Sequence, residues 1–404
     1  MPSHVSSRLP IHPFPTRNPA MTDLTFPTFD LHRLLESCFE PEPGERLAIL
    51  IDLPDPSLVE NFRYLGDPAF ELQALAHDEF YQPLRAGVAG QLKLGAVDLY
   101  AYRTVSGSNA ELPAQAVTPD GRVVDFVKEI CEGHSILLCL STHSATAPLL
   151  ALARRIGFRA ATMHGINRDV MQSGLCLDYR KVGEDTNRIR VALSPAERAE
   201  IDFFYGTQQF RLDIEIGGRH AGKSCGRCPP GQRNVENLPD GEVYFLPKSA
   251  SGTFPHKFED GTLAALRVVD GSIVDGTLLD GSAGTLAEGL QRFRDDPATA
   301  VICEFGLGTS RLPVTGTGIQ DEKIFGTFHL ATGRCDHLGG YIGPEAFKHA
   351  RNATHDDHLY NLGRTPEIGA QVRLVRKDRT DVLIENYVAS PLMLDLLDNR
   401  AVTQ

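Results

Sequence analysis

The sequence SILLCLST, residues 135–142, followed by TAPLLALARRIG, residues 146–157, decides the fold of the first half of this chain. The first stretch is an almost uninterrupted apolar run, which is typical of a strand buried on both faces of a parallel sheet. The second stretch has apolar residues at helical spacing and ends at Gly157, a residue type that commonly terminates helices. A strand followed closely by a helix is the repeating unit of an α/β domain.

The same alternation continues on both sides of this unit. RLAILIDL at residues 46–53 and GAVDLYAYRTV at residues 95–105 predict two further strands. Helices are expected in DLHRLLESCF (30–39), DPSLVENFRYLGD (55–67), AFELQALAHDEFYQPL (69–84) and VVDFVKEICEG (123–133). Another helix is predicted from Ser194, because Glu197 completes a capping box and Pro195 occupies the first helical position. The alternation favours an α/β domain built on a parallel sheet.

The sequence changes character after about residue 206. Short β-like runs are divided there by Gly and Asp, and Asp270-Gly271 is a strong signal for a two-residue hairpin turn. VRLVRKDRTDVLIENY at residues 372–387 predicts a closing hairpin. The predicted organisation is therefore a disordered tail over 1–20, an α/β domain with a parallel sheet over 21–205, and a mixed α+β metal-binding catalytic domain over 206–404.

Composition excludes several classes of partner and enzyme. The chain has 404 residues, a net charge of −12 and eight cysteines. The negative charge argues against nucleic acid or an anionic membrane surface as a partner, and no apolar run reaches the length of a membrane span. Dispersed cysteines favour reduced thiols and a cytoplasmic location, and we interpret Cys225 and Cys228 as structural loop cysteines. The motifs of serine hydrolases, zincins, P-loop NTPases and simple dinucleotide enzymes are absent from the sequence.

Five donors in the second half of the chain carry the strongest functional signal. They are Glu242 in NLPDGEVYFLP, Glu304 in VICEFGLGTS, His329 in DEKIFGTFHLATG, and His355 and Asp357 in NATHDDHLY. Each lies in or beside a short apolar run, where a charged group must be paired, and coordination is one way to pair it. His355 and Asp357 are two residues apart, so an extended segment places both on one face. Three carboxylates and two imidazoles suit one divalent first-row metal, or two metals that share a carboxylate.

Each donor also has an ordinary structural explanation. Glu242 and Glu304 can pair with arginines, and the histidines can be core residues with satisfied hydrogen bonds. The joint occurrence of all five donors favours the metal site over that explanation. Lys323, just before the GTFH motif, can polarise a substrate carbonyl or stabilise an oxyanion, and a solvated charged turn explains it equally well.

The motifs NLPDGEVYFLP, CEFGLGTS, DEKIFGTFHLATG and HDD, in this order, resemble the thermophilic metallopeptidase family, the aminopeptidase T type of leucyl aminopeptidases. The resemblance covers about residues 219–359 and is only general before them. It implies a homodimer of chains with an α/β N-terminal domain and a C-terminal domain that carries two divalent ions, zinc, cobalt or manganese. The ligands implied for those ions, with Glu304 as the bridging carboxylate, are Glu242, Glu304, His329, His355 and Asp357. The implied activity is an aminopeptidase-like hydrolase that removes N-terminal residues from small peptides through a water activated by two metals.

At one position the sequence departs from the family pattern. The peptidases carry a catalytic tyrosine seven residues after the histidine of the H-x-A-x-G motif, and here that position is Asp336. Glu304, Lys323 and Asp336 are therefore the candidate catalytic residues, and the replacement puts peptidase activity in doubt more than metal binding.

The resemblance also extends to mononuclear iron dioxygenases that cleave dihydroxypyridine rings, which share this fold with an altered ligand set. One Fe(II) held by two histidines and a carboxylate is thus the alternative, with a hydroxylated pyridine or aromatic substrate. Loss of the tyrosine favours this alternative, whereas retention of both Glu242 and Glu304 opposes it. A third hypothesis is a specialised biosynthetic homologue that binds metal without turning over ordinary peptides.

Overall fold

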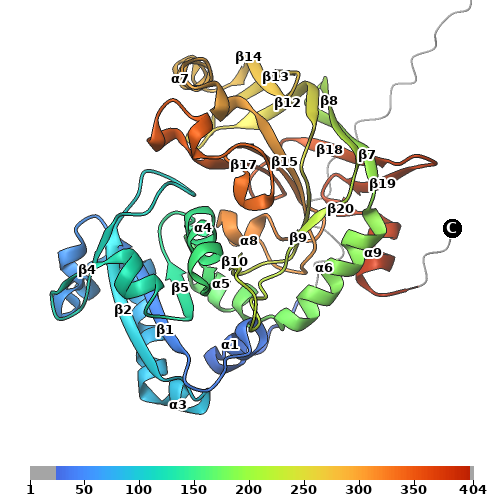
Figure 1. Cartoon of the computed structure of the whole chain (residues 1–404). Coiled ribbons are helices and arrows are strands. Elements are labelled where there is room, and N and C mark those ends of the chain that lie inside the picture. Colours follow the sequence, from blue (N-terminus) through green and yellow to red (C-terminus); the bar gives the residue numbers. More distant parts are fainter. Residues whose placement is uncertain (1–23, 401–404) are drawn as a thin grey trace, which may run out of the picture.

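The computed structural model describes residues 24–400, so the tail predicted over 1–20 lies outside the described residues. The blue and most of the green part of the chain form one lobe, whereas the rest of the green and the yellow to red part form most of the other (Figure 1). One sheet is largely parallel and two further sheets are antiparallel. The mixed α/β fold class expected from the sequence is confirmed.

The first lobe is organised around the parallel sheet. Its strand order is β10 (Val235–Asn237), β6 (Arg159–Thr162), β5 (Ile136–Leu140), β1 (Arg46–Leu53), β2 (Ala96–Arg103), β3 (Gln115–Val117) and β4 (Val123–Asp125). The pairs from β10 to β2 are parallel, and β3 and β4 add an antiparallel edge. The α-helices of this part are α1 (Leu31–Phe39), α2 (Glu71–Leu75), α3 (Ala89–Gln91), α4 (Thr146–Ile156), α5 (Arg168–Met171) and α6 (Tyr179–Leu193). The strands β1 and β5 are buried along almost their whole length, as their apolar sequences predict.

The second lobe contains the two antiparallel sheets. The site sheet has the order β17 (His355–Tyr360), β16 (Phe328–Gly333), β15 (Ile302–Gly308), β11 (Glu242–Phe245) and β9 (Gly222–Ser224). The outer sheet has the order β14 (Ser272–Asp280), β13 (Leu263–Val269), β12 (Ser249–Lys257), β8 (Gln208–Arg219), β7 (Ala196–Tyr205), β18 (Gly369–Val375), β19 (Thr380–Glu385) and β20 (Val388–Ala389). The helices α7 (Ala283–Asp295) and α9 (Pro391–Leu397) accompany these sheets, whereas α8 (Gly318–Asp321) packs with its Ile319 in the core of the first lobe.

The core of the second lobe lies between the site sheet and the outer sheet. The ring of Phe203 on β7 lies 5.1 Å from that of Tyr360 on β17 and 6.0 Å from that of Phe328 on β16. Because side chains alternate along a strand, Phe328 and Leu330 enter this core while His329 between them faces the other way. Burial of one face therefore fixes the register that presents the other face to the site.

Strand β7 lies where the sequence predicted a helix. The helix expected from Ser194 is instead an extended strand, whose Ala199, Ile201 and Phe203 are buried at every second position. The Ser194 hydroxyl donates to the Arg190 carbonyl at the end of α6 and accepts the backbone N–H of Ala221. The serine therefore ends one helix rather than beginning another.

Two other segments predicted as helices are only partly helical in the structure. Two predicted hairpins are confirmed. The segment Pro56–Gly66 is made of 3₁₀ turns interrupted by non-helical residues, and the first residues of the segment 123–133 form β4 before a helical segment over Phe126–Cys131. Asp270 and Gly271 both have positive φ and connect the paired strands β13 and β14. β18 and β19 form the predicted closing hairpin.

The chain crosses between the lobes more than once. β7 precedes residue 206 and pairs within the outer sheet, whereas β10 follows it and extends the parallel sheet beside β6. Within residues 24–400, no helix combines the length and the apolar character that crossing a membrane requires.

Candidate metal centre

The five predicted donors converge on one side of the site sheet. β11 contributes Glu242, β15 contributes Glu304, β16 contributes His329, and β17 contributes His355 and Asp357. Two sets of three donor atoms each lie within 4.8 Å of one another, one of Glu242, Glu304 and His329 and the other of Glu304, His355 and Asp357. Glu304 belongs to both sets, so it is the centre of the cluster. The structure thus provides donor groups that can hold a metal ion.

Local packing fixes where these side chains point. Phe305 and Leu307 face the core, so the alternation of β15 turns Glu304 to the site. Gly306, on the same face of β15, lies opposite His329 in the pairing with β16. A Cβ atom at Gly306 would lie 2.1 Å from Cε1 of His329, so only glycine leaves room for this imidazole.

The orientation of His355 leaves a nitrogen lone pair directed at the carboxylates. Its Nδ1 donates to the backbone carbonyl of Arg334 at 2.6 Å, which leaves Nε2 facing Glu304 Oε2 at 3.1 Å and Asp357 Oδ1 at 3.3 Å. A lone pair and two carboxylate oxygens at such distances repel unless a proton or a cation lies among them. A hydrogen bond from the non-ligating nitrogen to a carbonyl is also the usual support for a metal-bound histidine. The donor set therefore fits a divalent cation.

His329 approaches the same carboxylates from β16. Its Nε2 lies 3.6 Å from Glu304 Oε1, 3.8 Å from Glu242 Oε2 and 4.0 Å from Asp357 Oδ1. Burial lowers the pKa of His329, but hydrogen bonding to Glu304 and the neighbouring negative charges outweigh it and raise the pKa to about 9. Burial likewise raises the pKa of Glu304, yet the two histidines lower it to about 2. Both shifts mean that positive charge is favoured among these carboxylates, from a proton on the imidazole or from a metal ion.

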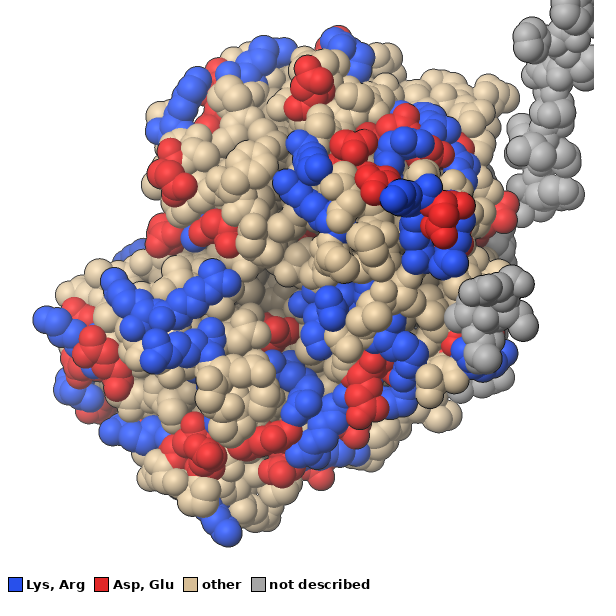
Figure 2. Space-filling view, turned by 45° about the vertical axis from the view of Figure 1, so that its right-hand side comes forward, with Lys and Arg blue, Asp and Glu red and all other residues tan. Residues whose placement is uncertain are grey.

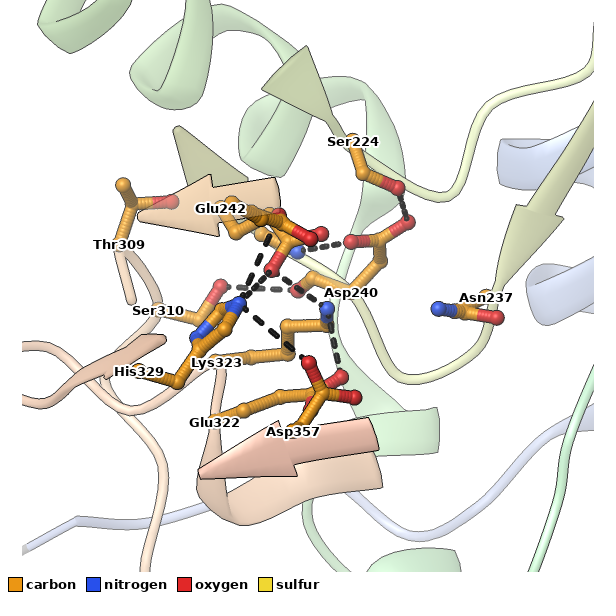
Figure 3. Close-up of polar contacts among 12 residues, drawn as sticks. Ser224, Asn237, Asp240, Glu242, Thr309, Ser310, Glu322, Lys323, His329 and Asp357 are labelled. Atoms are coloured by element: carbon orange, nitrogen blue, oxygen red, sulfur yellow. Dashed lines mark hydrogen bonds and ion pairs between the residues drawn. The ribbon is translucent and has the colours of Figure 1, made fainter. Parts of the chain in front are cut away.

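Glu242 differs from the other donors because it already has a cation. Lys323 Nζ lies 2.7 Å from Glu242 Oε2 and 2.7 Å from Glu322 Oε1, and all three side chains are buried (Figure 3). Opposing its burial, the negative charges of Glu242 and Glu322 raise the pKa of Lys323 well above its ordinary value. Burial raises the pKa of Glu322 to about 7. The solvated charged turn considered for Lys323 is wrong, because its side chain is buried.

Asp336 lies apart from the donor cluster. Its carboxylate receives two hydrogen bonds from the buried Arg334 guanidinium, at 2.8 and 3.3 Å. The same guanidinium also donates to Glu111, 3.0 Å away. The neighbouring His337, not Asp336, lines the cavity beside His355.

A cavity of about 270 Å³ opens in front of the cluster and is lined mainly by polar side chains. One wall carries the five donors, Glu322, Lys323 and His337. The opposite wall comes from the lobe of the parallel sheet and includes Asn109, Ser144, Thr146, His164 and Asn237. Figure 2 shows the surface hollowed between the two lobes, with Lys and Arg side chains on both sides.

The polar wall from the parallel sheet was not predicted from the sequence. Its residues lie after strand ends or on the short strand β10, and none belongs to a recognisable motif. The general rule that ligands bind beyond the carboxyl ends of parallel strands was the available signal. His164 and Thr146 follow β6 and β5, respectively, at such ends.

Comparisons with known proteins give a likeness of fold only. No protein-family model and no curated protein matches the sequence. The solved structure of 2,5-dihydroxypyridine dioxygenase from Pseudomonas putida KT2440 aligns with a TM-score of 0.55 and 13% identity, over 86% of this chain and 92% of that chain. A diacylglycerol kinase from Bacillus anthracis str. Sterne aligns with a TM-score of only 0.16 and 10% identity, over 87% and 93% of the two chains, and carries no argument. The resemblance to dioxygenases thus has support in the fold, whereas no family match supports the aminopeptidase resemblance.

Proposed function

We propose that this protein is a mononuclear iron(II) dioxygenase that opens the ring of a hydroxylated pyridine or aromatic molecule. The observation that carries the proposal is the division of the five donors. Glu304 faces both His329 and His355, and Asp357 faces His355, whereas Glu242 shares its oxygen near His329 with the ammonium of Lys323, 2.7 Å away. Two imidazoles with a carboxylate form the facial set that non-haem iron oxygenases use.

The shared fold adds support of a weaker kind. The first structural neighbour is by name a dioxygenase of 2,5-dihydroxypyridine, and its fold spans most of both chains. The position of the peptidase tyrosine is taken by Asp336, which is engaged by Arg334 and lies outside the cavity lining. The replacement of the tyrosine fits oxygen chemistry better than peptide hydrolysis, whereas the fold is compatible with both.

The chain's own residues would divide the remaining tasks. Iron(II) held by His329, His355 and a carboxylate of Glu304 or Asp357 would supply the one-electron chemistry through which dioxygen reacts with a ring. The Arg334 carbonyl orients the His355 imidazole, and Lys323 neutralises the buried Glu242. Glu322 lines the cavity, and burial raises the pKa of its carboxyl, which favours a role in accepting a proton from a substrate hydroxyl.

Metal analysis and oxygen uptake test this proposal directly. Protein purified anaerobically without chelator is analysed for metal content and then supplied with dihydroxypyridines and catechols in an oxygen electrode. One iron per chain and uptake with a member of this panel are expected. Two zinc, cobalt or manganese ions per chain, without uptake across the panel, would overturn the proposal. Light scattering on the same sample checks the homodimer expected from the family resemblance.

A two-metal aminopeptidase-like hydrolase is the second candidate. It is favoured by one observation, the membership of Glu304 in both donor sets, which is the arrangement of a bridging carboxylate. This function requires Glu242 to exchange its contact with Lys323 for a metal ion. Release of N-terminal residues from a peptide panel by zinc-, cobalt- or manganese-loaded protein, without oxygen uptake, would establish it in place of the dioxygenase.

A further inference from the structure

Hydrogen bonds hold the backbone N–H, the carbonyl and the side-chain oxygen of Asn109 in place, and only its side-chain nitrogen Nδ2 remains free of hydrogen bonds to the described residues. Its backbone N–H donates to the Ser144 carbonyl at 2.7 Å, and its own carbonyl accepts from Arg334 at 2.8 Å. Its side-chain Oδ1 accepts the backbone N–H of Ala147 at 2.8 Å. A backbone N–H can only donate, so this contact assigns the amide orientation and leaves Nδ2 as the remaining donor.

The amide of Asn109 is also buried and conformationally unusual. The residue is only 4% exposed, and its φ of +64° is in the left-handed region that asparagine tolerates better than most residues. Within the described part of the chain, Nδ2 has no hydrogen-bond partner, although the residue lines the cavity. Nδ2 is therefore a fixed donor that opens to the cavity, where an acceptor atom of a ligand can receive its hydrogen bond.

Asn237 presents a second amide on the same wall. Its Oδ1 lies 2.8 Å from the hydroxyl of Thr146 and 2.7 Å from that of Thr162 and accepts from both, and in this orientation its Nδ2 points away from the threonines. Figure 3 shows the amide nitrogen of Asn237 on the side of Lys323 and Glu322. No acceptor for this nitrogen occurs among residues 24–400. Two amide donors therefore enter the cavity from the wall opposite the metal centre.

Two cations also line the cavity. Arg154 lies on α4 of the parallel-sheet lobe and Lys223 lies on β9 of the site sheet, and neither side chain forms an ion pair with a carboxylate of the described residues. Glu236 also lines the cavity, but its oxygens already accept from Ser224, Asn234 and the backbone N–H groups of residues 225 and 226. Besides the metal donors, the cavity thus contains amide donors and two cations that no carboxylate of the described residues engages.

We propose that Asn109, Asn237, Lys223 and Arg154, which line the same cavity, bind a carboxylate of the substrate. The substrate class is then a single-ring molecule that carries a hydroxyl pair for the metal and a carboxylate on the opposite side. The cavity, at about 270 Å³, is at the small end of ligand pockets and suits one ring with its substituents. This inference rests on the proposed function, because it specifies the substrate of the same site.

Anaerobic binding to zinc-loaded protein tests the carboxylate without requiring turnover. Catechol, 2,3-dihydroxybenzoate and 3,4-dihydroxybenzoate share the chelating hydroxyl pair and differ in the presence and place of the carboxylate. Calorimetry should show at least one dihydroxybenzoate binding roughly ten- to a hundredfold tighter than catechol, as expected for hydrogen bonds to a charged group. Equal affinities, or no binding of any probe, would overturn the inference.

The variant Asn109→Asp tests whether Asn109 causes the tighter binding of the carboxylated probe. Aspartate keeps the acceptor for Ala147 and tolerates the left-handed backbone, but replaces the free donor with a negative oxygen. The ratio of the affinity for the carboxylated probe to the affinity for catechol should fall to about one or below, while the affinity for catechol itself is retained. A preference that survives in the folded variant would overturn the assignment.

Asn386→Asp is the matched control for this substitution. Asn386 also has a positive φ, of 49°, and its Oδ1 also accepts a backbone N–H, that of Ala370 at 3.1 Å, but it lies in the β19–β20 turn outside the cavity lining. This control should leave the preference unchanged. If Asn109→Asp does not fold, the exposed Lys223→Gln provides the test, with a reduced preference expected and an unchanged one overturning the inference.

The design separates failure of this inference from failure of the proposed function. Zinc is redox-inactive and oxygen is absent, so the binding preference does not depend on ring opening. Iron-dependent oxygen uptake with no preference for carboxylated probes would overturn only the carboxylate assignment. A clear preference without oxygen uptake by the iron-loaded protein would overturn only the dioxygenase.

Discussion

Two clusters of acidic residues in this protein differ in the partners of their carboxylates. On the outer sheet, Glu200 and Asp202 pair with arginines, with Arg211 at 2.9 Å from Glu200 and Arg373 at 2.7 Å from Asp202. On the site sheet, Glu304 is faced by imidazole nitrogens instead, and no arginine of residues 24–400 pairs with it. Arginine is charged at every accessible pH, whereas a histidine is a neutral metal ligand or a proton carrier.

The role of an acidic cluster therefore depends on which groups balance its negative charge. Fixed arginine partners make the outer cluster an ion-pair network, in which stability is the expected role. Exchangeable partners make the site cluster a place where a proton or a metal ion can be bound and released. The explanation that Glu242 and Glu304 pair with arginines is wrong for both residues, since Glu242 pairs with Lys323 and Glu304 with the histidines.

The largest effect is expected from Glu304→Ala. Because Glu304 is common to both donor sets, its removal should reduce bound metal to background and abolish oxygen uptake, with circular dichroism unchanged. Metal content is measured by elemental analysis of the purified protein. Glu200→Ala, the control from the outer sheet, should retain its metal. Full metal content in Glu304→Ala would remove the distinction between the two clusters.

Lys323→Met should produce the largest loss of stability. The substitution leaves Glu242 and Glu322 buried without their shared cation, and breaking a buried pair costs about 3–5 kcal/mol. Urea unfolding of the metal-free protein measures this free energy.

Lys257→Met provides the comparison for a more exposed pair. Lys257 lies 2.8 Å from Glu367, and both side chains are more than a quarter exposed. This variant should lose no more than about 1 kcal/mol. A similarly small loss in Lys323→Met would mean that Glu242 does not depend on Lys323 and is available to a second metal ion.

Local sequence predicted the donor cluster because each donor lies beside its own apolar run. β15 and β16 are recognisable as strands, and alternation along a strand puts the donor on the face opposite the core residues. The same reasoning found β1, β2, β5 and the Asp270-Gly271 hairpin. These features depend on contacts between near neighbours or on the alternation of a single element.

Other features depended on contacts that no local pattern contains. The serine, proline and glutamate after α6 imitate a helix start, but packing of alternate residues in the core selects the strand β7. The ion pair of Lys323 with Glu242 joins residues from separate elements, so its burial was not apparent. Asn109 became a candidate only when its backbone and Oδ1 contacts left Nδ2 without a partner.

The pH dependence of Glu200→Gln tests the outer cluster as an ion-pair network. Burial raises the pKa of Glu200, but its arginine partners outweigh burial and hold the pKa below its ordinary value. A pKa lowered by folding stabilises the protein above the unfolded-state pKa, and this contribution is lost as the pH falls through the folded-state pKa. The variant should therefore be less stable by up to about 1 kcal/mol at pH 7, with the difference disappearing in acid. Urea unfolding at several pH values measures it, and a difference that grows in acid would contradict the ion-pair assignment.

Asp336→Asn should have the smallest effect on activity, because Asp336 resembles the outer cluster rather than the metal centre. Its carboxylate is engaged by Arg334, which also holds the pKa of Asp336 below its ordinary value against the effect of burial. Oxygen uptake should stay within about twofold of wild type and stability should fall by about 1 kcal/mol. Asp381→Asn, which weakens pairs with Arg376 and Arg379, is the matched control and should behave alike. A large fall in kcat with unchanged metal content, seen in Asp336→Asn alone, would return Asp336 to the catalytic residues, because loss of an ion pair does not by itself slow chemistry at a separate site.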